Sequence, residues 1–267
     1  MIDKVEALLR EAAARAILPR FQRLQHHEIE EKSPGELVTA ADREAEHIIS
    51  AGLKALRPAA LVVGEEAAAL DPGVMTRLLG EDEVWLIDPL DGTAHFAAGR
   101  EPFAVMVALV HRRETVLSWM LDPVADAMRL AERGAGAFAD GMRVRAAAAC
   151  PPLGALRGAI LKRFMTPEDR AKIAQRESMI GTVLSGFMCA GREYPAVVAG
   201  EQHFALFQRM LPWDHAPGVL FAEEAGAMAR RLDGSPYVPG DQRRGLLVAQ
   251  NAEVWQLVRE TVLADLS

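Results

Sequence analysis

Residues 85–96 read Trp85-Leu86-Ile87-Asp88-Pro89-Leu90-Asp91-Gly92-Thr93-Ala94-His95-Phe96. An apolar run ends there in two carboxylates, Asp88 and Asp91. Because Pro89 lacks a backbone N–H, a strand cannot continue through this segment as a regular ladder, and the turn can aim both carboxylates at one point. Gly92 lets a backbone amide come close to a ligand, and Thr93 is a candidate helix start. Carboxylates beside free amides suit divalent cations bridged to a phosphate.

The composition allows a large core and disfavours a nucleic-acid partner. The chain has 267 residues, half of them hydrophobic, and a net charge of −7. This length suffices for one large domain or two closely packed ones. The negative charge and the lack of a basic run make nucleic-acid binding an unfavoured interpretation. There are two cysteines, Cys150 and Cys189. With a charged N-terminal segment and no membrane-length apolar run, they lead us to expect a cytoplasmic protein.

Apolar periodicity predicts helices and strands that mix without strict alternation. Residues 2–24 have helical spacing, 26–35 reads as a polar loop, and Thr39 is a candidate cap for a helix ending near Leu56. The remaining predicted helices are 167–176, 195–199, 217–225 and 252–263. The predicted strands are 61–63, 84–87, 103–110, 115–121, 127–132, 155–161, 204–207 and 246–249, with a turn over 134–138. This mixture favours layered α and β elements over a plain doubly wound sheet.

The segment Cys150-Pro151-Pro152-Leu153-Gly154 is the best candidate for a boundary within the chain. It divides an N-terminal α+β subdomain, residues 1–150, from a C-terminal α/β subdomain, residues 151–267.

Four segments place a carboxylate at the end of a predicted element. They contain Asp42, Glu65, the pair Asp88 and Asp91, and Asp214. Taken alone, most of these carboxylates have a structural explanation: Asp42 favours a helix N-terminus, Glu65 lies in a solvated loop, and Asp214 caps the following helix. The 88–93 segment is more specific, because its proline and glycine define the turn.

Taken together, the four segments resemble the motifs of the inositol monophosphatase family, the lithium-sensitive, magnesium-dependent phosphatases. The matching stretches are Val38-Thr39-Ala40-Ala41-Asp42, Gly64-Glu65-Glu66, Asp88-Pro89-Leu90-Asp91-Gly92-Thr93 and Trp213-Asp214-His215-Ala216-Pro217-Gly218. Their order and spacing fit from about Asp3 to Leu263. The resemblance implies a layered α-β-α-β-α sandwich of the inositol monophosphatase and fructose-1,6-bisphosphatase type. It also implies hydrolysis of a small phosphate monoester between the two subdomains, and a homodimer.

Carried over residue by residue, the resemblance also implies a role for each site residue. The metal ligands would be the carboxylates of Glu65, Asp88, Asp91 and Asp214 and the carbonyl of Leu90. Asp42 and Thr93 would polarise the attacking water, with Glu65 as a further catalytic residue, and the amides of Gly92 and Thr93 would hold the phosphate. Four gathered carboxylates repel one another unless cations neutralise them. Hard oxygen ligands favour Mg²⁺, two or three ions per site.

The chain departs from the family pattern where the substrate alcohol would bind. Inositol-binding members carry a Glu shortly before the C-terminal Trp-Asp, whereas Phe207 stands at that position here. Glu193 and Arg209 are candidates for binding the alcohol, with a surface or interface salt bridge as the plainer explanation. His95 replaces a usual Asn and is expected to pack or hydrogen-bond locally. Cys189 is expected to be a small buried residue.

Several functions remain open on this sequence. The substrate could be an inositol phosphate, a 3′(2′),5′-bisphosphate nucleotide, a sugar bisphosphate or histidinol phosphate. A different class is a regulatory binding protein of the same fold, acting on RNA or the transcription machinery. The intact acidic set argues against a scaffold without activity, and the negative net charge argues against a broad RNA surface.

Overall fold

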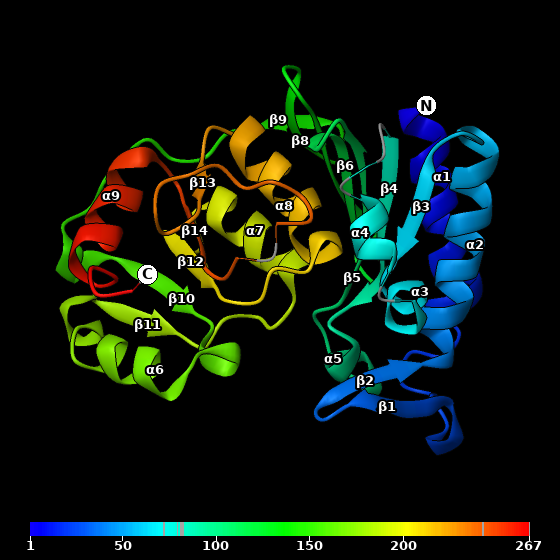
Figure 1. Cartoon of the computed structure of the whole chain (residues 1–267), viewed down its shortest axis with the longest axis horizontal. Coiled ribbons are helices and arrows are strands. Elements are labelled where there is room, and N and C mark those ends of the chain that lie inside the picture. Colours follow the sequence, from blue (N-terminus) through cyan, green and yellow to red (C-terminus); the bar gives the residue numbers. More distant parts are fainter. Residues whose placement is uncertain (72, 79, 81–82, 242, 267) are drawn as a thin grey trace.

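Five layers of helix and sheet, in the order α-β-α-β-α, make up the computed structural model (Figure 1). It describes residues 1–71, 73–78, 80, 83–241 and 243–266. The layered α+β architecture expected from the sequence is confirmed. No helix within these ranges is both long and apolar enough to cross a membrane.

Two large sheets form the second and fourth layers. The first contains β3 (Leu61–Gly64), β4 (Glu83–Asp91), β5 (Ala104–His111), β6 (Glu114–Asp122), β7 (Ala127–Glu132), β8 (Gly136–Ala139) and β9 (Met142–Val144), in that order. The second contains, from edge to edge, β11 (Thr182–Leu184), β10 (Arg157–Ile160), β12 (Phe204–Phe207), β14 (Leu246–Ala249) and β13 (Met228–Arg230). The segment 145–156, which includes the predicted boundary, connects them; whether the two halves are separate folding units stays a prediction.

Helices cover both faces of each large sheet. Helices α1 (Ile2–Ala12) and α2 (Ala40–Leu56) pack on the outer face of the seven-stranded sheet. Helices α7 (Ala190–Ala199) and α8 (Pro212–Glu224) lie between the two sheets (Figure 1). Helices α6 (Pro167–Ala174) and α9 (Ala252–Thr261) lie on the far side of the five-stranded sheet. The central helices therefore contact both halves of the chain.

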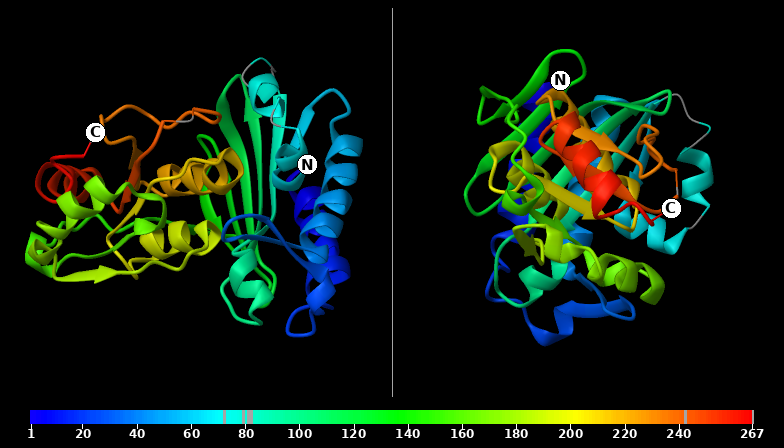
Figure 2. Two further views of the ribbon diagram at one scale, coloured as in Figure 1. Left: turned by 60° about the horizontal axis from the view of Figure 1, so that its bottom comes forward. Right: turned by 90° about the vertical axis from the view of Figure 1, so that its left-hand side faces the viewer.

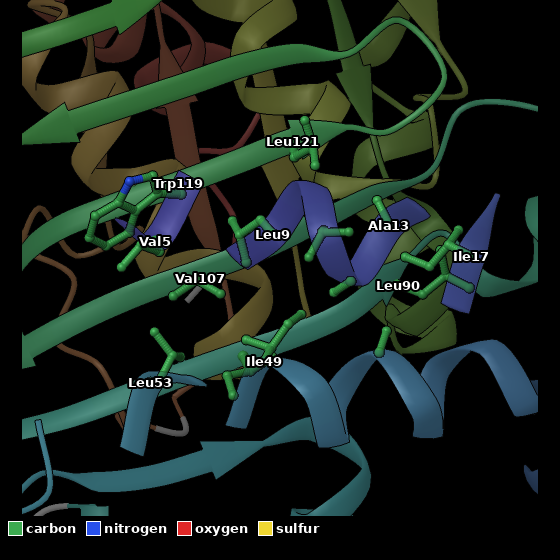
Figure 3. Packing of buried hydrophobic residues seen from close by; sticks show 14 of the residues in the cluster. Val5, Leu9, Ala13, Ile17, Ile49, Leu53, Leu90, Val107, Trp119 and Leu121 are labelled. Atoms are coloured by element: carbon green, nitrogen blue, oxygen red, sulfur yellow. The ribbon is translucent and has the colours of Figure 1, made fainter. Parts of the chain in front are cut away.

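The outer core is built by the apolar faces of α1 and α2 (Figure 3). Val5 and Leu9 of α1 and Ile49 and Leu53 of α2 are fully buried, and they pack against sheet residues that include Trp119. Burying each such side chain stabilises the fold by about 1.5–3 kcal/mol. This packing fixes α2 on the sheet, and with it the acidic residue at its N-terminus.

Strand β4 behaves as its proline predicts. It pairs in parallel with β3 and antiparallel with β5, and the register with β5 shifts between Asp88 and Asp91. The strand nevertheless extends through Asp91, further than the predicted 84–87. Gly92 follows with φ +86°, where a Cβ would lie 2.8 Å from the carbonyl oxygen of Pro102, so a larger residue is excluded there. Helix α5 (Thr93–Ala97) then begins at Thr93, as expected.

Helix α2 begins as predicted, at a cap formed by Thr39. The Thr39 side chain accepts a hydrogen bond from the amide of Ala41, and the carboxylate of Asp42 accepts one from the amide of Thr39. This reciprocal arrangement satisfies donors that the first turn of a helix leaves free. The helix ends at Leu56.

The segment predicted as a loop over 26–35 is instead a hairpin. After a 3₁₀ turn at His26–Glu28, β1 (Ile29–Ser33) pairs antiparallel with β2 (Glu36–Thr39) in a separate two-stranded sheet. The polar composition concealed the strands because much of β1 is exposed. Figure 2 (left) shows the hairpin reaching from the N-terminal layers towards the C-terminal half.

Other differences concern element ends and short elements. The predicted 2–24 helix is α1 followed by a π-helical turn at Ala13–Ile17. The second part of the predicted 134–138 turn is strand β8. The pattern did not indicate the short elements β9, β11, β13, α3 (Glu65–Leu70) and α4 (Val74–Leu78). Each spans six residues or fewer, too short for a clear periodicity.

Candidate active site

Three of the predicted metal ligands meet at one point between the two halves of the chain. One ligand oxygen from each of Glu65, Asp88 and Asp214 lies within 4.8 Å of the others. Glu65 opens α3 directly after β3, Asp88 lies in β4, and Asp214 is in the first turn of α8. The expectation that carboxylates from both sides of the 150–154 segment meet is therefore confirmed.

Asp91 and Leu90 line the same cavity in different ways. The Oδ2 atom of Asp91 accepts a hydrogen bond from the amide of Gly191 at 2.7 Å, at the start of α7. A Cβ on Gly191 would lie 2.5 Å from the Cβ of Ala104, so this approach of helix to strand depends on glycine. The carbonyl oxygen of Leu90 lies 2.9 Å from the hydroxyl of Thr93.

Burial makes the charged form of this cluster costly. It raises the pKa of Asp88 and of Asp214 well above the ordinary value, and the neighbouring carboxylates raise both further. Burial likewise raises the pKa of Glu65, and that of Asp91 to about 6. Full ionisation at neutral pH therefore needs cations, and a cluster with only oxygen ligands fits hard divalent cations such as Mg²⁺.

Lys32 of strand β1 is a site residue that the sequence analysis missed. Its Nζ lies 2.6 Å from Oε1 of Glu65 and 2.8 Å from Oε1 of Glu66. Burial lowers the pKa of Lys32, but the attraction of Glu65 and Glu66 outweighs this, and the net shift is upward. The ammonium group thus supplies positive charge to the cluster. Had the 29–39 segment been predicted as a hairpin, Lys32 could have been placed near Glu65 from the sequence.

Asp42 and Thr93 form the pair expected beside the carboxylates. The Thr93 hydroxyl lies 3.0 Å from Oδ1 of Asp42, and the other Asp42 oxygen accepts hydrogen bonds from the amide and hydroxyl of Thr39. Asp42 is almost completely buried, which raises its pKa to about 7. A carboxyl group with this pKa can take up or release a proton near neutral pH.

Glu46 of α2 is a second residue that the sequence analysis missed. Its carboxylate accepts hydrogen bonds from the amides of Glu66 at 2.8 Å and Ala67 at 2.9 Å, at the start of α3. A Cβ on Gly64 would lie 2.2 Å from the Glu46 carboxyl carbon, so the glycine permits this contact. Glu46 therefore fixes the turn that presents Glu65, although no motif in the sequence marks it.

Glu65, Asp88, Asp91, Thr93 and Asp214 line a cavity of about 300 Å³, and Asp42 adjoins it through the Thr93 hydroxyl. We name as the floor the residues Asp42, Glu65, Asp88, Asp91, Thr93 and Asp214. The same cavity is also lined by a set of longer side chains from the β1–β2 hairpin and the C-terminal half. We name as the wall the residues Glu36, Arg163, Phe164, Phe207 and Arg209.

Arg209 lies on the cavity wall, and an ion pair inside the molecule holds it there. Its guanidinium pairs with Glu36 of strand β2 and lies 4.3 Å from the ring centroid of Phe164. Burial lowers the pKa of Arg209, and the attraction of Asp214 opposes that shift. The salt bridge proposed as the plainer explanation for Arg209 therefore exists, but it borders the cavity.

Phe207 presents an apolar ring at the position where a carboxylate was sought. The ring stacks on Tyr194 at 5.0 Å and packs edge-on against His215 at 5.0 Å. Tyr194 Oη lies 2.8 Å from His215 Nδ1, and His215 Nε2 lies 2.7 Å from the carbonyl oxygen of Arg209. A carbonyl can only accept, so His215 donates from Nε2 and accepts from Tyr194 at Nδ1. Burial lowers the pKa of His215 to about 3, which keeps it neutral.

Glu193 does not lie among the residues that line the cavity. It is fully buried, accepting hydrogen bonds from the Gln202 side chain at 2.6 Å and the Phe187 amide at 2.7 Å. The surface salt bridge considered for it is therefore wrong, and a substrate contact has no support in this geometry. Glu193 instead holds the loop 186–188, whose Met188 lines the cavity.

His95 and Cys189 behave largely as expected. His95 Nε2 lies 3.0 Å from the carbonyl oxygen of Phe187, so its hydrogen bond joins α5 to the loop 186–188 and is not local in sequence. Cys189 is buried, and burial raises the pKa of its thiol well above the ordinary value. The prediction of a small buried residue is confirmed.

Comparison with known proteins gives one family. The sequence model described as the inositol monophosphatase family matches residues 1–265. The chain is 29% identical over 260 residues to an inositol-1-monophosphatase of Mesorhizobium japonicum, covering 96% of this chain and 93% of that protein. It is 30% identical over 256 residues to a Nus factor SuhB of Pseudomonas aeruginosa, covering 94% of this chain and 92% of that protein. Among solved structures, the extragenic suppressor protein suhB from Bartonella henselae has a TM-score of 0.81 at 25% identity, and the match covers 98% of this chain and 99% of that chain.

Proposed function

The chain belongs to the inositol monophosphatase family, and we propose that it is a Mg²⁺-dependent hydrolase of a small phosphate monoester. The observation that carries the proposal is the meeting of Glu65, Asp88 and Asp214 within 4.8 Å. The class of enzyme, a phosphoric monoester hydrolase, follows from the family and the inositol-1-monophosphatase relatives. The metal, the roles of the residues and the substrate are the proposed parts.

The floor residues fit two or three Mg²⁺ ions. Glu65, Asp88, Asp91 and Asp214 would hold them, together with the carbonyl oxygen of Leu90. The support is chemical, because buried oxygen ligands that repel one another favour a hard cation. When bound, the ions neutralise the phosphate, lower the pKa of a water molecule and stabilise the leaving alkoxide.

Thr93 and Asp42 are proposed to orient the attacking water and to accept its proton. The hydrogen-bond distance of 3.0 Å between them and the pKa of Asp42 near neutrality support this role. The backbone amides of Gly92 and Thr93 are proposed to hold the phosphate, because Gly92 leaves room for a close approach. Transfer to water is direct, without a phosphoenzyme.

The wall argues against inositol 1-phosphate as the best substrate. Phe207 cannot accept a hydrogen bond from a polyol, and a hydroxyl left unpaired there costs about 1–3 kcal/mol. The other substrates of the family type that we consider are a 3′(2′),5′-bisphosphate nucleotide, a sugar bisphosphate and histidinol phosphate. Arg209 favours those with a second anionic group.

A regulatory binding function is the second candidate, because three relatives are named Nus factor SuhB. The complete floor favours catalysis as the primary function. The net charge of −7 disfavours a broad nucleic-acid surface. A regulatory binding function would require a protein partner or a local surface patch that binds nucleic acid. A floor variant that has lost phosphatase activity would keep such a binding function.

Phosphate release from a panel of monoesters, with Mg²⁺ or with a chelator, tests the proposed function. The panel contains inositol 1-phosphate, a nucleoside 3′,5′-bisphosphate, fructose 1,6-bisphosphate and histidinol phosphate. We expect Mg²⁺-dependent turnover, with at least one compound exceeding inositol 1-phosphate in kcat/KM. No release from any compound would refute the catalytic proposal. A clear preference for inositol 1-phosphate would refute the interpretation of Phe207.

Two further proposals come from the family resemblance and the cysteines. We propose a homodimer, which light scattering at micromolar concentration tests against the 29.0 kDa of one chain. We also propose that the protein works in the cytoplasm, consistent with two unpaired cysteines, one of them buried.

A further inference from the structure

We propose that Arg209, with Arg163 and Arg100, forms a subsite for a second anionic group on the substrate, and that Glu36 fills this subsite in the free protein. The proposal rests on the proposed phosphatase function and names its substrate class. That class is a phosphate monoester whose alcohol part carries a carboxylate or another phosphate.

The ion pair between Glu36 and Arg209 is the first observation. Oε1 of Glu36 forms the ion pair with the Arg209 guanidinium. Oε2 of Glu36 accepts a hydrogen bond from the Ser33 hydroxyl at 2.8 Å. Both charged side chains are partly buried, at 26% and 35% exposure. Among the described residues that line the cavity, Glu36 is the one carboxylate outside the floor. An anionic group of the chain thus already occupies the cationic part of the wall.

The surroundings of Arg209 add more positive charge. Arg163 lies 5.0 Å from the Phe164 ring centroid, so Phe164 packs against both Arg163 and Arg209. The Arg163 guanidinium also donates a hydrogen bond to the carbonyl of Gly35 in the hairpin turn. Arg100 lines the same cavity and has no side-chain partner within the part of the chain that the structure describes. Three arginines therefore line this cavity, and one of them, Arg209, pairs with the Glu36 carboxylate.

The hairpin presents both kinds of charge to the cavity. Lys32 on β1 lies on the anionic floor at Glu65, while Glu36 on β2 lies on the cationic wall at Arg209. Each of these two side chains pairs with a group of opposite charge that lines the cavity. A substrate with two anionic groups would bring one phosphate to the floor and replace Glu36 at the wall. The hairpin geometry therefore points to a competition between Glu36 and the second anionic group.

The competing explanation is that the ion pair only fastens the hairpin. The two explanations predict different directions of change in substrate preference when each charge is removed. If the pair is a fastener, removing either charge loosens the same hairpin, and Glu36→Gln and Arg209→Gln change substrate use in the same direction. If Arg209 binds the substrate, Glu36→Gln frees it and raises the preference for an anionic alcohol, whereas Arg209→Gln lowers that preference.

The experiment compares substrates that differ by one carboxylate. The first pair is glycerol 3-phosphate and 3-phosphoglycerate, and the second is glucitol 6-phosphate and 6-phosphogluconate. The preference is the ratio of kcat/KM within a pair, measured for the wild type, Glu36→Gln, Arg209→Gln and the double variant. Arg230→Gln is the matched control, because Arg230 pairs with Glu223 away from the cavity. Calorimetric binding of the same compounds gives a readout that needs no turnover.

In at least one pair we expect Arg209→Gln to lower the preference for the carboxylate compound about tenfold, the size of a charged hydrogen bond. Glu36→Gln should raise it several-fold, the double variant should resemble Arg209→Gln, and Arg230→Gln should match the wild type. Changes of the same sign in both single variants, or no gain in Glu36→Gln, would overturn the proposal. If Arg209→Gln does not fold, Glu36→Gln alone decides. If no compound is hydrolysed, the phosphatase proposal fails, while the binding ratios still test the subsite.

Discussion

The floor and the wall of the cavity differ in how the chain builds them. Two of the floor residues stand in strand β4, and the others stand at or near the starts of helices α2, α3, α5 and α8. The wall residues come from the hairpin, a 3₁₀ turn and the segment around β12, and charged contacts between distant segments join several of them. The backbone therefore fixes the positions of the floor residues, while side-chain pairs that a single substitution can remove hold the wall, where we propose that selectivity is set.

This contrast predicts different outcomes for substitutions in the two regions. A floor substitution should change the rate on every substrate alike. A wall substitution should change the ratio between substrates. A floor variant that changes only selectivity, or a wall variant that stops all turnover while remaining folded, would break the distinction.

The largest effect is expected for Asp88→Asn. Loss of one anionic ligand should weaken Mg²⁺ binding and reduce turnover by about a thousandfold. The metal-free variant should be at least as stable as the wild type, because burial and neighbouring carboxylates make the Asp88 charge unfavourable. Steady-state kinetics over a range of Mg²⁺ concentrations and thermal unfolding measure both. Glu253→Gln, an exposed change in α9, is the control; normal activity of Asp88→Asn would contradict the metal assignment.

A smaller effect is expected for Thr93→Ala. Its hydroxyl is proposed to act in the chemical step, so kcat should fall about a hundredfold while the Mg²⁺ dependence changes little. Asp42→Asn should behave similarly. Thr93→Ser keeps the hydroxyl and should retain most of the activity. The idea fails if Thr93→Ala keeps its kcat, or if the serine variant is as slow as the alanine variant.

The smallest effect concerns stability and pH. Asp42 and Asp91 have pKa values of about 7 and about 6 in the folded protein, above the ordinary value of about 4. Between the ordinary value and these raised values, the folded state therefore binds more protons than the unfolded state. The stability that these two carboxyl groups give to the metal-free protein is lost as pH rises from about 4 to 7. Mg²⁺ offsets the repulsion, so its stabilising effect should grow with pH. Its increase in Tm should be a few degrees larger at pH 7.5 than at pH 5, and an equal or smaller increase would be contrary evidence.

Sequence reasoning reached the floor residues as a set through motif resemblance, and local features explain the geometry of two of those motifs. Pro89 interrupts the regular ladder with β5 and Gly92 turns the chain, and the cap at Thr39 requires only residues within one helical turn. These signals operate over a few residues, so they can be interpreted without the tertiary structure. Asp214 was found by motif resemblance, since nothing local brings it to Asp88.

The wall and the supporting residues were not predictable in the same way. Lys32, Glu193 and Arg209 are charged side chains whose ordinary position is the protein surface. Whether such a residue is buried depends on its partner in the folded structure, and here the partners are Glu65, Gln202 and Glu36 respectively. Those of Lys32 and Arg209 lie far along the chain. The hydrophobic periodicity of the sequence does not indicate which charged residues are buried or which residues they pair with.

Helix α8 lies between the two sheets, while β1 and β2 form a sheet of their own. In hydrogen exchange with deuterated solvent, the amides of α8 should therefore exchange only when the two halves of the molecule separate. Those of β1 and β2 should exchange through local opening. Asp214 and Glu36 therefore stand on segments that we expect to open on very different timescales. The hairpin side of the cavity should open and re-form while helix α8 stays folded.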